Sequence, residues 1–134
     1  MEGKRVMRRS FLWSKIHRIR VTETDPGYEG SLTLDPWLMA AARMLPYQKI
    51  EVYDVDNGER FSTYLIEGEA GSGVCCVNGA AARKTAPGHR IIVATYAELE
   101  PEEIAAHVPW VVLVDGENRI TRESREIVAG TRVG

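Results

Sequence analysis

A single β-hairpin in the middle of the sequence constrains the fold more than any other feature. Residues 49–55 are rich in β-forming side chains, and the tetrapeptide Asp56-Asn57-Gly58-Glu59 that follows is a strong hairpin turn. The chain then returns through a second β-forming run from Arg60 to Ile66. The hairpin therefore predicts two adjacent antiparallel strands within a β-rich domain.

Short β-forming runs bounded by turn signals recur along the rest of the chain, with two brief helices between them. The dipeptide Asp35-Pro36 is typical of a helix start, and we expect this helix to continue to Leu45 and to stop at Pro46. A second helix is predicted over Pro101–His107. The other predicted strands are Phe11–Thr22, Gly73–Val77, Arg90–Glu98 and Trp110–Val114. Their regular spacing favours a mainly-β fold, either a small barrel or a sandwich.

The size and the charge of the chain exclude several classes of protein. A length of 134 residues suits one domain, and a formal net charge of -2 gives no overall basic field that would attract nucleic acid. No run approaches the ~18 apolar residues of a membrane helix, so we expect a cytoplasmic protein without a membrane partner. The adjacent Cys75 and Cys76 and the scattered histidines lack the spacing of metal ligands, so no metal site is predicted.

The dipeptide Gly30-Ser31 is the first candidate for chemistry. Gly30 has no Cβ, so its backbone can adopt strained torsions and a hydroxyl can approach its carbonyl carbon. Attack by the Ser31 oxygen on that carbon would exchange the amide for an ester, and elimination would then free the Gly30 carboxylate. The dehydroalanine left at position 31 would hydrolyse to a pyruvoyl group. A Gly-Ser pair beside a Pro-Gly turn is most often an ordinary loop, and the dipeptide alone does not decide between the two interpretations.

Two further segments carry groups suited to binding a small substrate. Arg60 can hold a carboxylate through paired hydrogen bonds, and Tyr64 can donate a proton or simply pack on the sheet. Side chains alternate along a strand, so Thr63 should face away from Arg60 and Tyr64 unless a bulge or a subunit interface intervenes. The segment Asn78-Gly79-Ala80-Ala81 offers backbone N–H groups beside small side chains, although a tight turn is the simpler interpretation.

These segments occur in the order and spacing of one known family. The blocks are Ser14-Lys15-Ile16-His17-Arg18, Tyr28-Glu29-Gly30-Ser31, Asn57-Gly58-Glu59-Arg60-Phe61-Ser62-Thr63-Tyr64 and Val77-Asn78-Gly79-Ala80-Ala81-Ala82. Together they resemble the bacterial aspartate 1-decarboxylases over most of the chain, from about Phe11 to Val114. Four blocks in register are far more specific than any single one. The sequence departs from the family at Tyr53, where many relatives carry tryptophan, and in a divergent tail after Thr121.

The resemblance implies a double-psi β-barrel that assembles as a homotetramer, with active sites between subunits. It implies cleavage between Gly30 and Ser31, with or without a maturation factor, and conversion of Ser31 into a covalent pyruvoyl cofactor. The substrate L-aspartate would form a Schiff base with this group and give β-alanine and carbon dioxide for pantothenate and coenzyme A synthesis. By the same resemblance, Tyr64 is the proton donor, and the substrate-binding residues are Lys15, Arg60, Thr63, Asn78, Gly79, Ala80 and Ala81. Thr63 would also be needed for processing.

The expected organisation is an N-terminal extension of residues 1–10, a barrel of residues 11–116 and a polar tail of residues 117–134 that frays. Cleavage would give a β chain of residues 1–30 and an α chain of residues 31–134. Two alternatives stay open. A barrel that has lost self-processing would act as a binding or assembly module, and a pyruvoyl enzyme with a different pocket would act on another acidic amino acid, such as glutamate.

Overall fold

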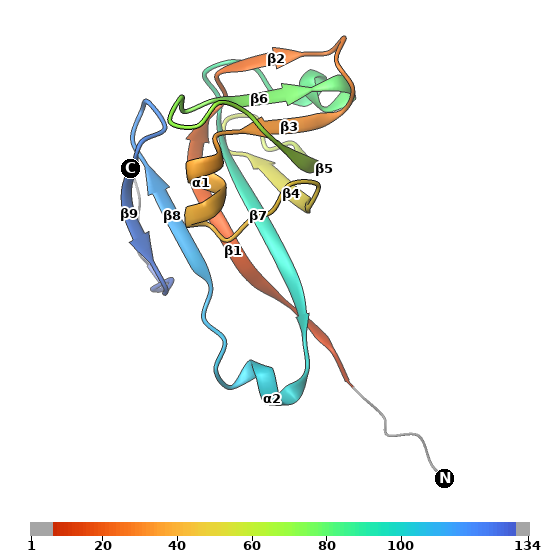
Figure 1. Cartoon of the computed structure of the whole chain (residues 1–134). Helices are drawn as coiled ribbons and strands as arrows, with labels where there is room; N and C mark the ends of the chain where they lie inside the picture. Colours follow the sequence, from red (N-terminus) through yellow and green to blue (C-terminus); the bar gives the residue numbers. More distant parts are fainter. Residues whose placement is uncertain (1–6, 131–134) are drawn as a thin grey trace.

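The computed structural model describes residues 7–130, which form nine strands, two short α-helices and one 3-10 helix (Figure 1). The strands are β1 (Arg9–Arg20), β2 (Glu23–Asp25), β3 (Ser31–Leu34), β4 (Lys49–Asp54), β5 (Arg60–Glu67), β6 (Cys75–Asn78), β7 (Arg90–Leu99), β8 (Trp110–Val114) and β9 (Ile120–Ser124). The helices are α1 (Pro36–Ala41), η1 (Gly79–Lys84) and α2 (Pro101–Ile104). The extension and the tail predicted from the sequence lie partly outside the described residues. Neither α-helix in this part of the chain has the length to cross a bilayer.

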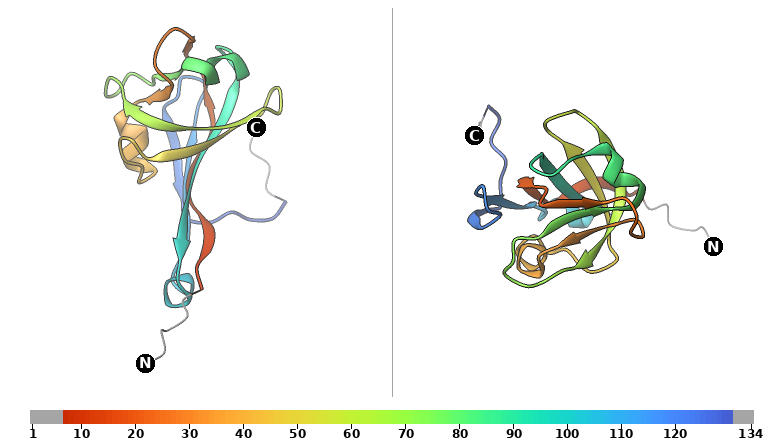
Figure 2. Two further views of the ribbon diagram at one scale, coloured as in Figure 1. Left: turned by 90° about the vertical axis from the view of Figure 1, so that its right-hand side faces the viewer. Right: turned by 90° about the horizontal axis from the view of Figure 1, so that it is seen from above.

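All nine strands belong to one sheet, in the order β2-β6-β3-β5-β4-β7-β1-β8-β9. The pairs β1 with β8, β2 with β6 and β3 with β5 are parallel, and the other neighbouring strands are antiparallel. The predicted mainly-β single domain is confirmed. The arrangement is consistent with a double-psi β-barrel. In this structure the hydrogen-bonded sheet is not closed, and β2 and β9 are its two edge strands. Strands β1 and β7 extend from the barrel as a long twisted arm that carries α2 near its end (Figure 1, Figure 2).

Alternation of inward and outward side chains builds the core. In β4, Ile50 and Val52 are fully buried, whereas Lys49, Glu51 and Tyr53 point to the other side of the sheet. The same pattern repeats along the neighbouring strands. The core also contains Ile16, Ile19, Val21, Leu32, Leu34, Leu65, Val77, Ile91, Val93 and Val112. One face of the sheet therefore packs inside the barrel, and the more polar side chains lie on the opposite face.

Helix α1 begins where the sequence predicts and ends earlier. Asp35 is its N-cap, because the side-chain Oδ1 accepts a hydrogen bond from the backbone N–H of Trp37 at 2.9 Å. The helix stops at Ala41 because Arg43 adopts a left-handed φ of 55°, and the following N–H groups bond helix carbonyls in a Schellman ending. The predicted end at Leu45 is therefore wrong. The backbone conformation ends the helix before the proline is reached.

The C-terminal segment forms a strand that the sequence does not predict. The side-chain Oδ1 of Asp115 accepts hydrogen bonds from the backbone N–H groups of Glu117 at 2.8 Å and Arg119 at 3.0 Å. This turn brings β9 back antiparallel to β8, so the predicted fraying is wrong for residues 120–124. The side chains of β9 are mostly exposed on both faces, so the strand lacks the alternating pattern by which strands are recognised. Helix α2 is also shorter than predicted and ends at Ile104.

Candidate active site

The Gly30–Ser31 link lies where the loop after β2 enters β3, beside the end of β6. Ser31 is only 1% exposed and pairs with Asn78 across the two antiparallel strands. The side-chain Nδ2 of Asn78 donates hydrogen bonds to Ser31 Oγ and to Thr33 Oγ1, each at 3.0 Å. The Ser31 hydroxyl in turn donates to the carbonyl oxygen of Glu29 at 3.4 Å. The hydroxyl predicted to attack the backbone is thus buried and held on two sides.

The backbone of Gly79 packs directly against the same link. Gly79 has a φ of 67°, and a Cβ placed on it would lie 2.6 Å from Cα of Gly30 and 2.8 Å from its nitrogen. No side chain fits at such distances, so position 79 requires glycine. A Cβ on Gly30 would meet no atom within 4 Å, and φ of Gly30 lies outside the left-handed region. Gly30 thus shows no left-handed strain, and no atom outside its chain neighbours crowds the position that a side chain would take.

Helix η1 continues from Gly79 and carries the other residues of the predicted small-side-chain segment. Figure 2 shows η1 beside the loop that joins β2 to β3, which contains Gly30. Ala80 is exposed, whereas Ala81 is half-buried against the core. The segment from Asn78 to Ala81 therefore lies at the predicted cleavage point. This is the position that it must occupy if the sequence blocks form one site.

The strand register shows which predicted residues share a side of the sheet. Leu32 pairs with Leu65 of β5, and both are fully buried. The residues just before them, Ser31 and Tyr64, therefore face the opposite side together. Thr63 is on the inner face of β5, because β4 and β5 pair without a bulge. The expected separation of Thr63 from Tyr64 is confirmed for the single chain.

We call the side of the sheet that carries Arg60 and Tyr64 the outer face, and it continues across β4 and β7 to β1. One cross-strand row joins Ser62, Glu51, Ala94 and Lys15. Lys15 therefore shares the outer face with Arg60. Three strand spacings separate β5 from β1, which amounts to about 14 Å. This is a distance between strand backbones. The lining of the cavity beside Lys15 contains no residue of β5, so Lys15 and Arg60 border different parts of the outer face.

Lys15 lines a separate cavity of about 220 Å³ beside β8 and the C-terminal segment. Its Nζ lies 3.4 Å from Nδ1 of His17. Burial lowers the pKa of Lys15, and burial together with the charges of Lys15 and Arg18 lowers the pKa of His17. Arg122 of β9 lines the same cavity and adds a further positive charge. Glu126 also lines the cavity, so the cavity carries charges of both signs beside apolar side chains, and the contribution of Arg122 was not predicted from the sequence.

Sequence reasoning also missed three contacts at the site. It treated Asn78 as a source of backbone N–H groups, whereas the side-chain amide of Asn78 holds the Ser31 hydroxyl. Thr33 could have been found, because it follows Ser31 by two positions on one strand and so shares its face. Tyr53 and Tyr96, whose hydroxyl oxygens lie 2.8 Å apart, come from strands that are distant in the sequence. No local pattern pairs these two tyrosines.

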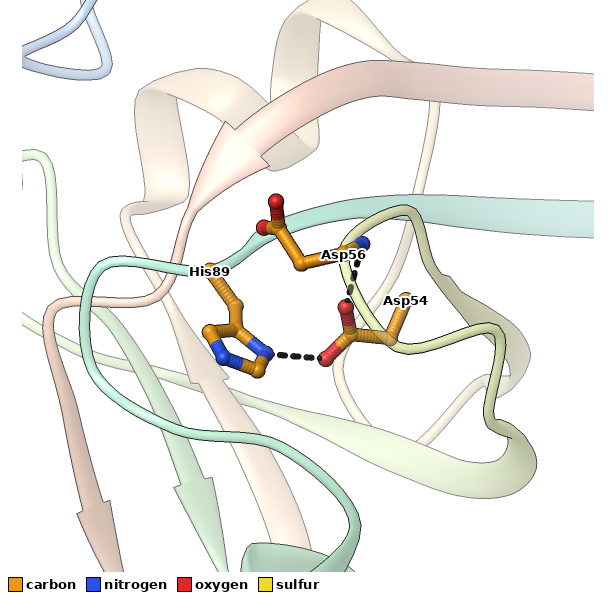
Figure 3. A group of neighbouring side chains, drawn as sticks. All are labelled: Asp54, Asp56 and His89. Atoms are coloured by element: carbon orange, nitrogen blue, oxygen red, sulfur yellow. Dashed lines mark hydrogen bonds and ion pairs between the residues drawn. The ribbon is translucent and has the colours of Figure 1, made fainter.

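A second polar cluster lies outside the site, where Asp54, Asp56 and His89 place possible ligand atoms within 4.8 Å of one another (Figure 3). The Asp54 carboxylate accepts hydrogen bonds from Thr85 Oγ1 at 2.7 Å and from the backbone N–H groups of Asp56 and Asn57, and it lies 2.8 Å from His89 Nδ1. Burial tends to raise the pKa of Asp54, but these hydrogen bonds outweigh burial and lower it. Protein donors thus occupy both carboxylate oxygens. We interpret the cluster as a clamp between the β4–β5 turn and the segment after η1.

Comparison with known proteins identifies the family. The model of the family described as aspartate decarboxylase matches residues 7–121, and the chain belongs to this family. The aspartate 1-decarboxylase of Syntrophobacter fumaroxidans is 62% identical over 113 residues, which cover 84% of this chain and 91% of that protein. The aspartate 1-decarboxylase of Syntrophus aciditrophicus is 54% identical, over 85% of this chain and 98% of that protein. The aspartate 1-decarboxylase of Wolinella succinogenes is 51% identical, over 90% of this chain and 100% of that protein. The resemblance stated from the four sequence blocks is confirmed.

Proposed function

We propose that this protein is a self-processing aspartate 1-decarboxylase that converts L-aspartate into β-alanine and carbon dioxide. The proposal rests chiefly on the contact of Asn78 and Gly79 with the Gly30–Ser31 link, where the buried Ser31 hydroxyl follows a glycine without a side chain. The names of the relatives at 51% and 62% identity support aspartate as the substrate. The β-alanine would serve pantothenate and coenzyme A synthesis.

The bonds exchanged in the proposed self-cleavage all belong to Gly30 and Ser31 of one chain. Ser31 Oγ attacks the carbonyl carbon of Gly30, the C–N bond breaks, and the amide becomes an ester with a free amine on residue 31. Loss of the Ser31 α-proton then expels the Gly30 carboxylate. Water replaces the nitrogen of residue 31, which leaves as ammonia, and a pyruvoyl group results. Asn78 orients the Ser31 oxygen, and the pairing of β3 with β6 keeps the two side chains together.

The residues around Ser31 fit the use of such a group on an acidic substrate. A pyruvoyl group supplies an electron-withdrawing carbonyl that accepts the electrons released when a carboxylate leaves. Tyr64 faces the same side as Ser31 and returns a proton to the α-carbon of the substrate. Arg60 holds a substrate carboxylate through paired hydrogen bonds. The backbone at Gly79, Ala80 and Ala81 positions the substrate beside residue 31.

A second subunit completes the site in this proposal. Lys15 lines a cavity beside β8, three strands away from the β5 strand of Arg60, and a neighbouring chain would bring a second set of these cations to the substrate. In the single chain, Thr63 points to the inner face of β5 and Tyr64 to the outer face, so one site cannot easily use both side chains. A site shared between subunits would remove this conflict. Tyr64 is 38% exposed on a face that a neighbour can cover. A homotetramer with sites between its subunits fulfils these requirements.

The first test is the intact mass of the purified protein under denaturing conditions. We expect two fragments, residues 1–30 and 31–134, and a single uncut chain for Ser31→Ala. Ser72→Ala, which alters a loop serine that bonds only its own loop, is the matched control and should be cut normally. Cleavage only after addition of cell extract would assign processing to a maturation factor. An active but uncut chain would remove the proposal.

The second test is product analysis with a panel of acidic amino acids. We expect β-alanine from L-aspartate, and borohydride added with aspartate should tag residue 31. Product from glutamate alone would identify a pyruvoyl enzyme of a different acidic amino acid. A folded chain that is neither cut nor active would instead be the binding or assembly module. In either case the assignment to aspartate is wrong.

A further inference from the structure

The guanidinium of Arg60 is held against a neighbouring ring on the outer face. Arg60 pairs with Tyr53 across β5 and β4, and its Cζ lies 4.6 Å from the centre of the Tyr53 ring. A guanidinium over an aromatic face is attracted by the negative charge of that face. The contact restricts the directions in which Arg60 can present its N–H groups to a ligand.

Tyr53 is itself fixed by a second tyrosine. Its hydroxyl oxygen lies 2.8 Å from that of Tyr96 on β7, the next strand of the sheet. Tyr53 pairs with Ile92 of β7, and Ala94 and Tyr96 follow on the same face of that strand. The small side chain of Ala94 leaves room for the two tyrosine rings to meet. Burial and the hydrogen bond with Tyr96 raise the pKa of Tyr53 to about 12. The Tyr53 hydroxyl therefore keeps its proton at neutral pH, which favours its hydrogen bond with Tyr96.

We infer that the pair of Tyr53 and Tyr96 orients Arg60 for the carboxylate of the substrate. The inference rests on the proposed function, in which Arg60 is the carboxylate grip. A free arginine loses rotamer entropy when it binds a ligand, whereas an arginine already held over a ring loses less. The pair therefore strengthens the binding of dicarboxylates and leaves the chemistry at residue 31 unchanged. Tyr53 and Tyr96 are positioning residues, because they act through Arg60.

The test compares variants that remove either the ring or only a hydroxyl group. We expect Tyr53→Leu to raise KM for aspartate roughly 2- to 5-fold, with kcat and self-cleavage unchanged. Tyr53→Phe and Tyr96→Phe each break the same hydrogen bond and should raise KM by less. Because they share one interaction, the double variant should equal either single variant. Tyr53→Trp keeps a ring below the guanidinium and should restore KM to near the wild-type value.

The matched control is Tyr47→Phe, because Tyr47 is 79% exposed and lies outside the outer face. We expect it to leave KM unchanged. Inhibition by succinate, which has the carboxylates but no amine, provides a reading that does not depend on catalysis, and its inhibition constant should rise with KM in Tyr53→Leu. The inference is overturned if Tyr53→Leu binds aspartate and succinate as the wild type does, or if the two Phe substitutions have additive effects. Wild-type protein that makes no β-alanine would instead refute the proposed function.

Discussion

The two halves of the candidate site differ in how much of their surroundings one chain supplies. The cleavage centre at Gly30, Ser31 and Asn78 is enclosed, and Ser31 is 1% exposed. The outer face is open, and its proposed proton donor Tyr64 is 38% exposed. In the proposed cleavage centre, Glu29 and Asn78 of the same chain already hold the reacting hydroxyl. On the outer face, the candidate cations Lys15 and Arg60 lie on strands β1 and β5, which β4 and β7 separate.

This difference separates two kinds of reaction. A reaction that occurs once, on the backbone itself, can use a centre closed by its own strands. A reaction that must admit substrate and release product needs an accessible surface that is closed by another element. We therefore expect cleavage to depend on packing around residue 31, and turnover to depend on the outer face and on assembly.

The largest effect should come from Tyr64→Phe, which removes the proposed proton donor and keeps the ring. Turnover of aspartate should fall roughly 10²- to 10⁴-fold, the usual contribution of a positioned general acid, whereas self-cleavage should proceed normally. Steady-state kinetics and a denaturing gel measure the two properties, with Tyr47→Phe as the control. Loss of cleavage in Tyr64→Phe would show that self-cleavage also depends on the outer face, and the proposed division of the site would be wrong.

Gly79→Ala should have a smaller effect, and it should slow self-cleavage where Tyr64→Phe slows turnover. The added Cβ would lie 2.6 Å from Cα of Gly30, so the cleavage centre must shift, and cleavage should slow roughly 10- to 100-fold. The control is Gly88→Ala, because Gly88 also has a left-handed φ, of 90°, but an added Cβ there meets no atom within 4 Å. Time courses of the uncut chain measure both rates. Equal rates for the two variants would mean that the contact of Gly79 with Gly30 has no role in cleavage.

Mixing two inactive variants tests whether the outer face is completed by a neighbour. Lys15→Ala and Tyr64→Phe each impair turnover alone in the proposal. If Lys15 and Tyr64 of one site come from different chains, random reassembly of the two variants leaves about a quarter of the sites with both native residues. Activity should therefore recover to about a quarter of the wild-type value after unfolding and joint refolding. No recovery would mean that both residues act from one chain.

The smallest effect concerns His89, which lies at the Asp54 clamp outside both halves. The hydrogen bond with Asp54 raises the pKa of His89 above its ordinary value of ~6.5. A raised pKa in the folded state stabilises the fold fully below the unfolded-state pKa, and this contribution is lost as the pH rises through the folded-state pKa. The Tm of the wild type should therefore fall more between about pH 6 and about pH 8 than the Tm of His89→Gln. Calorimetry showing parallel Tm profiles would contradict this role of the clamp.

The sequence predicts those elements whose local pattern coincides with their burial. The hairpin is an example, because the inward residues of β4 and β5 alternate with polar ones and the turn lies between them. Strand β9 is the opposite case, because its side chains are exposed and its stability comes from pairing with β8. The early end of α1 also escaped prediction, because it depends on the left-handed backbone of Arg43, which no residue type required.

The candidate site was predictable only where neighbours in sequence are neighbours in space. The alternation along β5 correctly separates Thr63 from Tyr64, and the adjacency of Gly30 to Ser31 defines the link. The sequence does not reveal that β6 lies beside β3, and this pairing brings Asn78 to Ser31. It also does not reveal that β7 lies beside β4, and the tyrosine pair depends on that order. Contacts between such distant strands are determined by topology.

The place of the Gly30–Ser31 link in the strand order determines how the two polypeptides would behave after the proposed cut. The link lies between β2 and β3, and the shorter polypeptide contains β1 and β2. Strand β1 is inserted between β7 and β8, and β2 pairs with β6, all of which belong to the longer polypeptide. Strands of the two proposed products therefore alternate in one hydrogen-bonded sheet, and we expect the products to co-purify until a denaturant separates them.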